Sequence, residues 1–296
     1  MFTEAQKTAI IDNWNDAVYK NLLRSIELYT EKWKLSNLTF LEYYSMNAIF
    51  FCKSEPHGDS ILKIGCGYQD DEFVSEYNVL SEYGGKKFVK IYEGDIVGAA
   101  KAMLLERVSP GTRLIDNLPL DERLAVYSGL YDRLHIEPEN PAIYMKYADK
   151  LGYYVNYIKG RGDCGELYAH ALKAKEIYGA VSEKYDRVAL LHGDLHSENI
   201  ILGSGEYIII DPQGLAGDPV FEIPRFILNT YYKSIDMPKD ALKNSIKHMI
   251  HSLEGSLSAP GEIIKQCFYI ETVMFECWRA STGGYDVRNV LFADTV

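Results

Sequence analysis

The feature that most constrains the fold is a short β-rich segment, residues 189–211, within a half of the chain that is otherwise patterned as helix. It contains L-L-H-G-D-L-H-S-E-N-I-I-L and, after a short polar stretch, ends within I-I-I-D-P-Q-G, which continues to residue 214. The apolar runs predict short buried strands, which would hold the polar loop between them rigidly. We therefore expect the side chains of Asp194, Asn199 and Asp211 to project from the open end of this segment.

These three polar residues are of the types that phosphoryl transfer needs. Asp194 would accept or orient a hydroxyl proton, while the amide oxygen of Asn199 and the carboxylate of Asp211 would be ligands of the magnesium ions that bridge the phosphates. An alternative is a metal-dependent hydrolase in which His192 and His196, four residues apart, bind zinc. That alternative leaves the flanking strands and Asp211 without a role, whereas in the first interpretation His192 packs behind the loop and orients Asp194.

The spacing of these motifs resembles the catalytic loop and the D-F-G segment of protein kinases, with Pro212 and Gln213 in place of Phe-Gly. The order H-G-D-L-H-x-x-N-I and I-D-P-x-G-L-x-G-D-P-x-x-E is more similar to the aminoglycoside phosphotransferases, in particular to the streptomycin 6-kinase and hydroxyurea phosphotransferase group. This resemblance implies an enzyme, an ATP-dependent small-molecule kinase that uses ATP or GTP with Mg²⁺ and moves the γ-phosphate to a hydroxyl.

The resemblance also implies an α+β, protein-kinase-like fold of two lobes. A Ser-Pro-Gly turn is the clearest punctuation in the first half of the chain, and we place the lobe boundary there. Residues 1–108 would form an N-terminal helix and a nucleotide-binding lobe with an antiparallel sheet. Residues 109–296 would form a mainly helical lobe with the catalytic loop and the acceptor site.

The first half of the chain must then hold a nucleotide. Lys63 stands alone in an apolar strand, where an unpaired ammonium would be costly to bury, so a phosphate and a carboxylate are its natural partners. Glu76, in a helix expected over residues 70–83, is the predicted carboxylate. Glu72, one turn earlier, is the alternative.

Two further segments complete the nucleotide site that the resemblance implies. The run M-L-L-E-R-V-S-P-G resembles the hinge of the family, whose main-chain groups bind the edge of adenine, with Glu106 and Val108 as the expected contacts. The loop between the first two strands lacks the G-x-G-x-x-G run of protein kinases. Ser45 and Asn47 are the candidates for phosphate contacts there.

Charge bears on the acceptor and on the partners. The net charge of −11 disfavours nucleic acid or an anionic membrane surface as a main partner and is compatible with a cationic substrate. Glu198 lies in the catalytic loop, and Glu271, Glu276 and Trp278 lie on a helix expected nearby, where they would form an acidic and aromatic wall for a streptomycin-like cation. In the alternative interpretation these are solvated surface charges that only favour solubility.

Cysteine usage and hydropathy predict a cytoplasmic protein. Five cysteines form no C-x-x-C pair, which argues against a disulfide framework, and no stretch reaches the ~18 apolar residues of a membrane span. The sequence leaves open the acceptor, the oligomeric state and whether any drug phosphorylation is the native role. A metabolic kinase of the choline, fructosamine or homoserine type and a catalytically inactive pseudokinase that binds nucleotide stay as alternatives.

Overall fold

The chain divides into two compact units, which we treat separately. The computed structural model describes residues 2–41, 46–67, 70–98 and 100–296. By their contacts, Met1–Thr112 and Ile201–Gln213 form unit 1, and Arg113–Ile200 and Gly214–Val296 form unit 2. The segment that carries Asp211 therefore groups with unit 1, although it follows the loop that carries Asp194 in the sequence.

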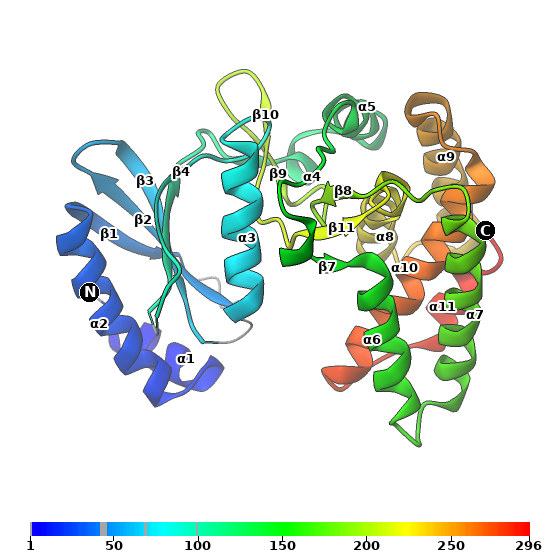
Figure 1. Cartoon of the computed structure of the whole chain (residues 1–296), viewed down its shortest axis with the longest axis horizontal. Helices are drawn as coiled ribbons and strands as arrows, with labels where there is room; N and C mark the ends of the chain where they lie inside the picture. The colour runs from blue at the N-terminus through cyan, green and yellow to red at the C-terminus, as the bar shows by residue number, and fades with distance from the viewer. Residues whose placement is uncertain (1, 42–45, 68–69, 99) are drawn as a thin grey trace. The chain divides into compact units, whose positions relative to one another are not determined.

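Unit 1 is built on a five-stranded sheet with the order β1-β2-β3-β5-β4, in which all neighbouring strands are antiparallel (Figure 1). The strands are β1 Leu35–Leu41, β2 Asn47–Ser54, β3 Gly58–Gly65, β4 Ile91–Asp95 and β5 Ala102–Glu106. The antiparallel sheet predicted from the sequence is thus confirmed. Lys63 lies in the central strand β3, opposite Ile49 of β2 and Met103 of β5.

The helices of unit 1 are α1 Glu4–Asn13, α2 Asp16–Lys32 and α3 Asp70–Tyr83. Leu22, Ile26 and Tyr29 are buried at helical spacing on α2, and they share one core with Phe50 and other inward-facing residues of the sheet. The sequence predicted an N-terminal helix in this part of the chain. It is interrupted because the side chain of Asn15 caps a new helix by accepting a hydrogen bond from Val18 N at 2.9 Å.

Unit 2 is mainly helical, as expected. Its helices are α4 Leu114–Asn117, α5 Leu120–Tyr131, α6 Tyr147–Lys159, α7 Gly165–Ser182, α8 Ile223–Lys233, α9 Lys239–Leu257, α10 Gly261–Ser281 and α11 Val287–Ala293, with short 3₁₀ helices η1 Pro141–Ile143 and η2 Pro219–Phe221. Helix α10 packs against α6, α7, α8, α9 and α11, so it forms the centre of this unit. Among the described residues, no helix is long and apolar enough to cross a bilayer.

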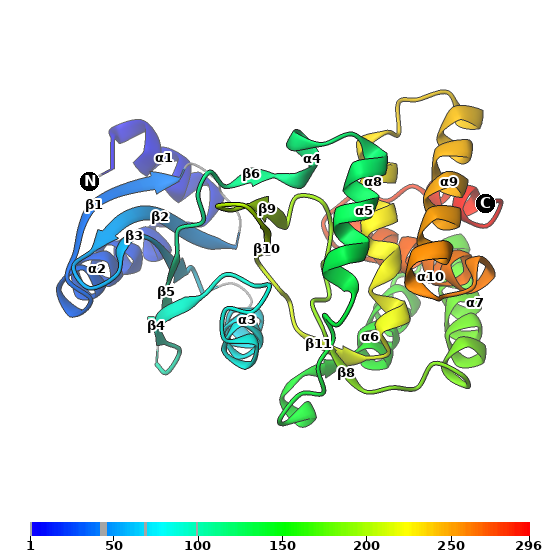
Figure 2. The ribbon, with the colours of Figure 1, turned by 90° about the horizontal axis from the view of Figure 1, so that it is seen from above.

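Short strands flank the polar loop, as the apolar runs predicted. In unit 2, β11 Leu215–Gly217 pairs with β8 Ala189–Leu191 and with β7 Met145–Lys146, and Figure 2 shows β8 and β11 side by side. A second small sheet has the order β10-β9-β6, from β10 Tyr207–Ile209, β9 Ile200–Leu202 and β6 Thr112–Arg113. Strand β8 leads into the loop that carries Asp194, and β9 follows it.

Candidate functional site

In unit 1, an ion-pair cluster brings together three of the residues predicted from the sequence. Lys63 Nζ lies 2.8 and 2.6 Å from the two carboxylate oxygens of Glu76 and 2.5 Å from Asp211 Oδ1. Lys63 and Glu76 are each only 5% exposed. The partner of Lys63 on α3 is therefore Glu76, the first choice from the sequence, and not Glu72.

Burial and charge act against each other in this cluster. Burial alone would lower the pKa of the Lys63 ammonium, but the carboxylates of Asp211 and Glu76 outweigh it and raise the pKa, so Lys63 stays charged. Burial raises the pKa of Glu76 to about 7, against the opposing effect of Lys63. A lysine fixed in this way presents a permanent positive charge to a phosphate.

The backbone of Asp211 adopts a conformation that is rare for a residue other than glycine. Its φ is 60°, in the left-handed region, and such a residue persists only where its surroundings determine it. Hydrogen bonds between Ile209 and Lys87 at 2.8 Å and between Val89 and Ile209 at 2.9 Å fix the preceding strand. The Asp211 side chain remains 57% exposed, so this carboxylate suits an oxygen ligand of Mg²⁺.

The expected hinge begins where β5 ends. Glu106 N donates to Lys90 O at 2.9 Å, so a main-chain contact from Glu106 to adenine would use its carbonyl. Val108 follows in an extended segment, and Gly111 N donates to Leu202 O at 2.9 Å.

The loop between β1 and β2 is described only in part. Asn47 is half-buried at the start of β2, opposite Gly65 of β3. Ser45 lies outside the described residues. The predicted phosphate contact from Asn47 therefore stays a prediction.

In unit 2, two buried side chains hold the backbone of the loop that carries Asp194. Glu222, 1% exposed, accepts hydrogen bonds from His192 N at 2.6 Å and from Gly193 N at 3.1 Å. The His192 ring accepts one from Asp194 N at 3.1 Å, which is the orienting role predicted for it. Burial alone would raise the pKa of Glu222, but the nearby His135 and His192 outweigh it and lower the pKa.

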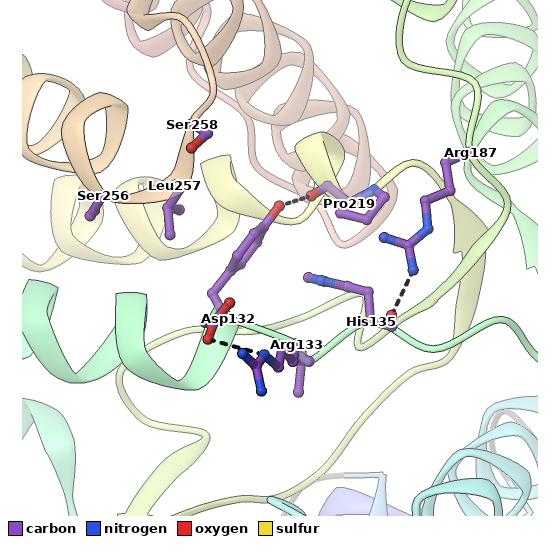
Figure 3. Close-up of a pocket in the computed structure, with 10 residues that line it drawn as sticks. Asp132, Arg133, His135, Arg187, Pro219, Ser256, Leu257 and Ser258 are labelled. Atoms are coloured by element: carbon purple, nitrogen blue, oxygen red, sulfur yellow. Dashed lines mark hydrogen bonds and ion pairs between the residues drawn. The ribbon is translucent and has the colours of Figure 1, made fainter.

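Glu222 was not among the residues predicted for the site, although it is the last letter of the second motif. Its neighbour His135 lies 3.7 Å away and lines a cavity of about 220 Å³ in unit 2 (Figure 3). Tyr131 also lines this cavity and donates to Pro219 O at 2.8 Å, while Arg187 donates to His135 O at 2.8 Å. None of the predicted site residues lines the cavity.

Asn199 and the second histidine are fixed within the same loop. Asn199 Nδ2 donates to Asp194 O at 3.0 Å, which leaves the amide oxygen as the group that can bind a metal ion. His196 Nδ1 accepts from Glu198 N at 3.2 Å, and its Nε2 lies 3.5 Å from Asp194 Oδ2. The zinc alternative requires a group of at least three His, Cys, Asp or Glu side chains placed to hold a metal ion. Among the described residues there is no such group.

An arginine that was not predicted from the sequence contacts the carboxylate of Asp194. Arg225 Nε, on α8, donates to Asp194 Oδ1, and Arg225 Nη1 lies 3.5 Å from Glu271 Oε1. Tyr147 OH donates to the other oxygen of Glu271 at 3.3 Å. Burial alone would raise the pKa of Asp194, but Arg225 and His196 outweigh it and hold the pKa well below the usual range, so Asp194 is ionised. The one sequence feature that could have indicated Arg225 as a site residue is its position three residues after Glu222, where the second motif ends.

Glu198 is also paired. It lies 3.1 Å from Arg113 Nη1 and 3.1 Å from Lys233 Nζ, and it accepts a hydrogen bond from Asn229 Nδ2 at 2.9 Å. Burial alone would raise the pKa of Glu198, but its bonds to Asn229 and Lys233 outweigh it and lower the pKa. This carboxylate is therefore ionised, and it forms ion pairs with two basic side chains.

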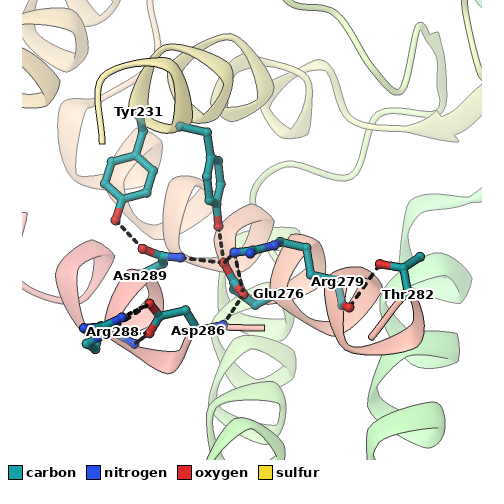
Figure 4. Close-up of polar contacts among 8 residues, drawn as sticks. Tyr231, Glu276, Arg279, Thr282, Asp286, Arg288 and Asn289 are labelled. Carbon is teal, nitrogen blue, oxygen red and sulfur yellow. Dashed lines mark hydrogen bonds and ion pairs between the residues drawn. The ribbon is translucent and has the colours of Figure 1, made fainter. Parts of the chain in front are cut away.

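Glu276 is a structural residue, which corrects the substrate contact predicted for it. It is 0% exposed and lies in a polar network (Figure 4). It accepts hydrogen bonds from Tyr232 OH, from Arg279 Nη1 at 3.0 Å, from Asn289 Nδ2 at 2.7 Å and from Asp286 N at 2.7 Å. These contacts tie α10 to α8 and α11, so the carboxylate has no surface on which an acceptor could bind.

Trp278, on the same helix, is 43% exposed. Its ring lies 5.3 Å from Phe275, and the guanidinium of Arg225 lies 5.1 Å from the Phe275 ring. The structure thus brings Glu271 and an aromatic pair to the neighbourhood of Asp194, while Glu276 faces the interior.

Comparison with known proteins places this geometry in a family. A family model described as aminoglycoside/hydroxyurea antibiotic resistance kinase matches residues 56–283. Streptomycin 6-kinase of Streptomyces griseus is 32% identical over 170 residues, which are 55% of this chain and 52% of the relative. Hydroxyurea phosphotransferase of Kitasatospora aureofaciens is 34% identical over 168 residues, 55% of this chain and 48% of the relative. The chain thus spans about half the length of these curated relatives.

Solved structures support the same fold. An aminoglycoside phosphotransferase, APH(4)-Ia, in a ternary complex with ADP and hygromycin B matches with a TM-score of 0.61 at 13% identity, covering 91% of this chain and 96% of that one. Choline kinase LicA from Streptococcus pneumoniae matches with a TM-score of 0.64 at 12% identity, covering 94% and 99%. These likenesses confirm the predicted protein-kinase-like fold. Because the family model covers most of the sequence, the chain belongs to the aminoglycoside/hydroxyurea antibiotic resistance kinase family.

Proposed function

We propose that the protein is an ATP-dependent phosphotransferase that moves the γ-phosphate of the nucleotide to a hydroxyl group of a small molecule. The observation that carries the proposal is the setting of Asp194. Its carboxylate is held ionised by Arg225, and its backbone is fixed by His192 and by the amide of Asn199. A hydroxyl placed against such a carboxylate is oriented for attack on phosphorus.

The lowered pKa of Asp194 defines its part in the reaction. A strongly ionised carboxylate is a weak base, but it is a good acceptor for the hydrogen bond of a hydroxyl. In a loose transition state the attacking oxygen loses its proton late, so orientation contributes more than early proton removal. We therefore assign Asp194 to holding the acceptor hydroxyl in line and receiving its proton as the bond to phosphorus completes.

The remaining predicted residues hold the nucleotide in this proposal. Lys63, fixed by Glu76, would bind phosphate oxygens, and the main chain at Glu106 and Val108 would bind the adenine edge. Ser45 and Asn47 would contact the phosphates from the loop between β1 and β2.

Magnesium has its own pair of residues. Asn199 and Asp211 are the oxygen ligands proposed for it, and both fit a hard cation. When bound, Mg²⁺ neutralises charge that develops on the phosphates.

The two curated relatives are named for two chemically different acceptors. One is named for streptomycin and the other for hydroxyurea, so both compounds belong in the first panel. The cationic, streptomycin-like acceptor predicted from the sequence and the small metabolic alcohols are tested by the same panel, with ATP and GTP as donors.

Nucleotide binding gives the direct test. At ~100 times its Kd, a ligand adds about 2.7 kcal/mol to the free energy of unfolding. In thermal-shift titrations with ATP, Asp211→Ala should lose the part of the shift that depends on magnesium. Asp59→Ala removes an exposed carboxylate of the same unit and should keep it. If Asp211→Ala behaves like Asp59→Ala, the metal assignment is wrong, and if no compound in the panel releases ADP, the proposed activity is wrong.

A further inference from the structure

Most charged side chains on the Asp194 side of unit 2 are paired with a side chain of opposite charge. Glu271 interacts with Arg225 and Lys150, and Glu198 interacts with Arg113 and Lys233. The set contains the four acids Asp116, Asp194, Glu198 and Glu271 and the four bases Arg113, Lys150, Arg225 and Lys233. The buried carboxylate of Glu222, behind the loop, is a fifth acid, so only one net negative charge of the acidic chain remains in this neighbourhood.

Arg225 is the charged group best placed to meet an acceptor at Asp194. Its side chain is 20% exposed, and the two ion pairs occupy Nε and Nη1. The other terminal nitrogen, Nη2, still has hydrogen atoms to donate, because a guanidinium carries five N–H groups. The sequence predicted acidic and aromatic side chains at this point, and the structure puts a guanidinium beside them.

An aromatic strip continues from Arg225. Phe275 lies under the guanidinium at 5.1 Å, Tyr232 is 4.6 Å from Phe275, and Trp278 is 5.3 Å from it. Phe275 is half-buried and Trp278 is exposed, so this strip offers an apolar surface next to a hydrogen-bond donor. Aromatic faces of this kind bind the apolar face of a ring or a flat group.

We propose that the acceptor is an uncharged, oxygen-rich hydroxyl compound, and that Arg225 is the residue that selects it. One oxygen of the acceptor accepts a hydrogen bond from the Arg225 guanidinium, and an apolar face of the acceptor lies on Phe275 and Trp278. This inference rests on the proposed phosphotransferase function and narrows its substrate class. The hydroxyl oxygen bonds to the γ-phosphorus while the bond from phosphorus to the β,γ-bridging oxygen breaks, ADP leaves, and the hydroxyl proton passes through Asp194 to solvent.

Charge is the reason for choosing this class. A cationic acceptor would meet the like charge of Arg225, or would have to displace it from both Asp194 and Glu271. An anionic acceptor would meet the Asp194 carboxylate and the nucleotide phosphates. An uncharged oxygen can use the Arg225 donor while both ion pairs stay in place.

The test uses matched acceptors in which one hydroxyl group is replaced by an amine or one CH₂OH group by a carboxylate. Glucose, glucosamine and glucuronate form one set, and glycerol, 3-amino-1,2-propanediol and glycerate form another, with hydroxyurea and streptomycin added singly. ADP release gives kcat/KM for each compound at fixed pH and salt. We expect the uncharged member of at least one set to exceed its amine-bearing partner by about tenfold or more, the factor that ~1.4 kcal/mol provides.

Variants of Arg225 test the residue itself. Arg225→Met leaves Asp194 and Glu271 without their cation, so the ratio of uncharged to amine-bearing acceptor should fall by about tenfold, mainly through KM. Arg225→Lys keeps the charge but loses the planar fork, so it should retain the order of acceptors with a raised KM. Lys247→Met removes one positive charge from the exposed side of α9 and should leave the ratio as in the wild type.

Each outcome decides a separate point. Transfer to amine-bearing compounds or streptomycin alone overturns the acceptor class and leaves the proposed function standing. The role of Arg225 is overturned if the ratio of uncharged to amine-bearing acceptor in Arg225→Met stays within threefold of wild type. It is also overturned if that ratio falls equally in Lys247→Met. If Arg225→Met does not fold, the wild-type ratios and Arg225→Lys still decide the matter. No transfer to any compound overturns the proposed function itself.

Discussion

The backbone of the loop that carries Asp194 depends on one buried carboxylate, and Glu222→Gln tests that dependence with almost no change in shape. The carboxylate accepts from His192 N at 2.6 Å and from Gly193 N at 3.1 Å. A glutamine amide has one oxygen, so it can keep one of these bonds while its NH₂ group faces the other N–H. The variant therefore loses one charge-assisted hydrogen bond and leaves a buried donor unsatisfied.

The expected loss follows from those two effects. A hydrogen bond to a charged group contributes about 1.5–3 kcal/mol, and an unsatisfied buried donor costs about 1–3 kcal/mol. The effects overlap because they concern the same N–H, so we expect the free energy of unfolding to fall by about 3 kcal/mol. At roughly 2–4 °C per kcal/mol for a chain of this size, the melting temperature should fall by about 6–12 °C.

The pH dependence provides an independent check on the same residue. The folded protein holds the pKa of Glu222 below its ordinary value, so the stabilising contribution is complete above the unfolded pKa of about 4.3. It is lost as the pH falls through the lowered folded pKa. Glu222→Gln has no such group, and its stability should therefore decline less steeply in acid than that of the wild type.

Urea unfolding followed by circular dichroism measures the stability, and ADP release measures kcat, which should fall because Asp194 is no longer held in register. The control is Glu262→Gln, an exposed glutamate at the start of α10, which should stay within about 0.5 kcal/mol of wild type. Equal unfolding free energy and equal kcat in the Glu222 and Glu262 variants would refute the argument.

Three further predictions concern other parts of the site. Asp194→Asn should lower kcat by ~10²–10⁴-fold with little change in the ATP-dependent thermal shift; turnover near wild type removes Asp194 from the mechanism. Lys63→Met should lower the free energy of unfolding by about 3–5 kcal/mol at pH 8, because it leaves a buried carboxylate unpaired. The deficit should shrink at pH 5, where Glu76 takes up a proton, and a deficit independent of pH contradicts this account. Glu276→Gln should lower the melting temperature without changing the KM of any acceptor, whereas a raised KM would restore Glu276 to the acceptor site.

The sequence predicted best where residues that act together lie close in the chain or where one residue demands a partner. The loop from Asp194 to Asn199 is continuous, so its flanking strands and their order could be recognised from apolar runs alone. Lys63 could be linked to Glu76 because a lone ammonium in a buried strand requires a carboxylate, and Glu76 lies near the middle of the next helix. Both inferences rest on local patterns.

The sequence could not predict which distant base meets which carboxylate. Asp194 and Arg225 are 31 residues apart, Glu198 and Arg113 are 85 apart, and both pairs depend on tertiary packing. Helical spacing also gave no sign that Glu276 faces the interior, since α10 is buried around most of its circumference and lacks a polar face there.

A charge summed over a whole chain is therefore a weak guide to the field at one site. Near physiological salt, exposed charges are screened over about 8 Å, so the field at Asp194 is set by its direct neighbours rather than by the total of −11. Those neighbours pair acids with bases, and removing any one member changes the local charge by a full unit. Substrate charge preference in this protein thus depends on single ion pairs such as that of Arg225 with Asp194, which is why one substitution there is expected to alter the class of acceptor.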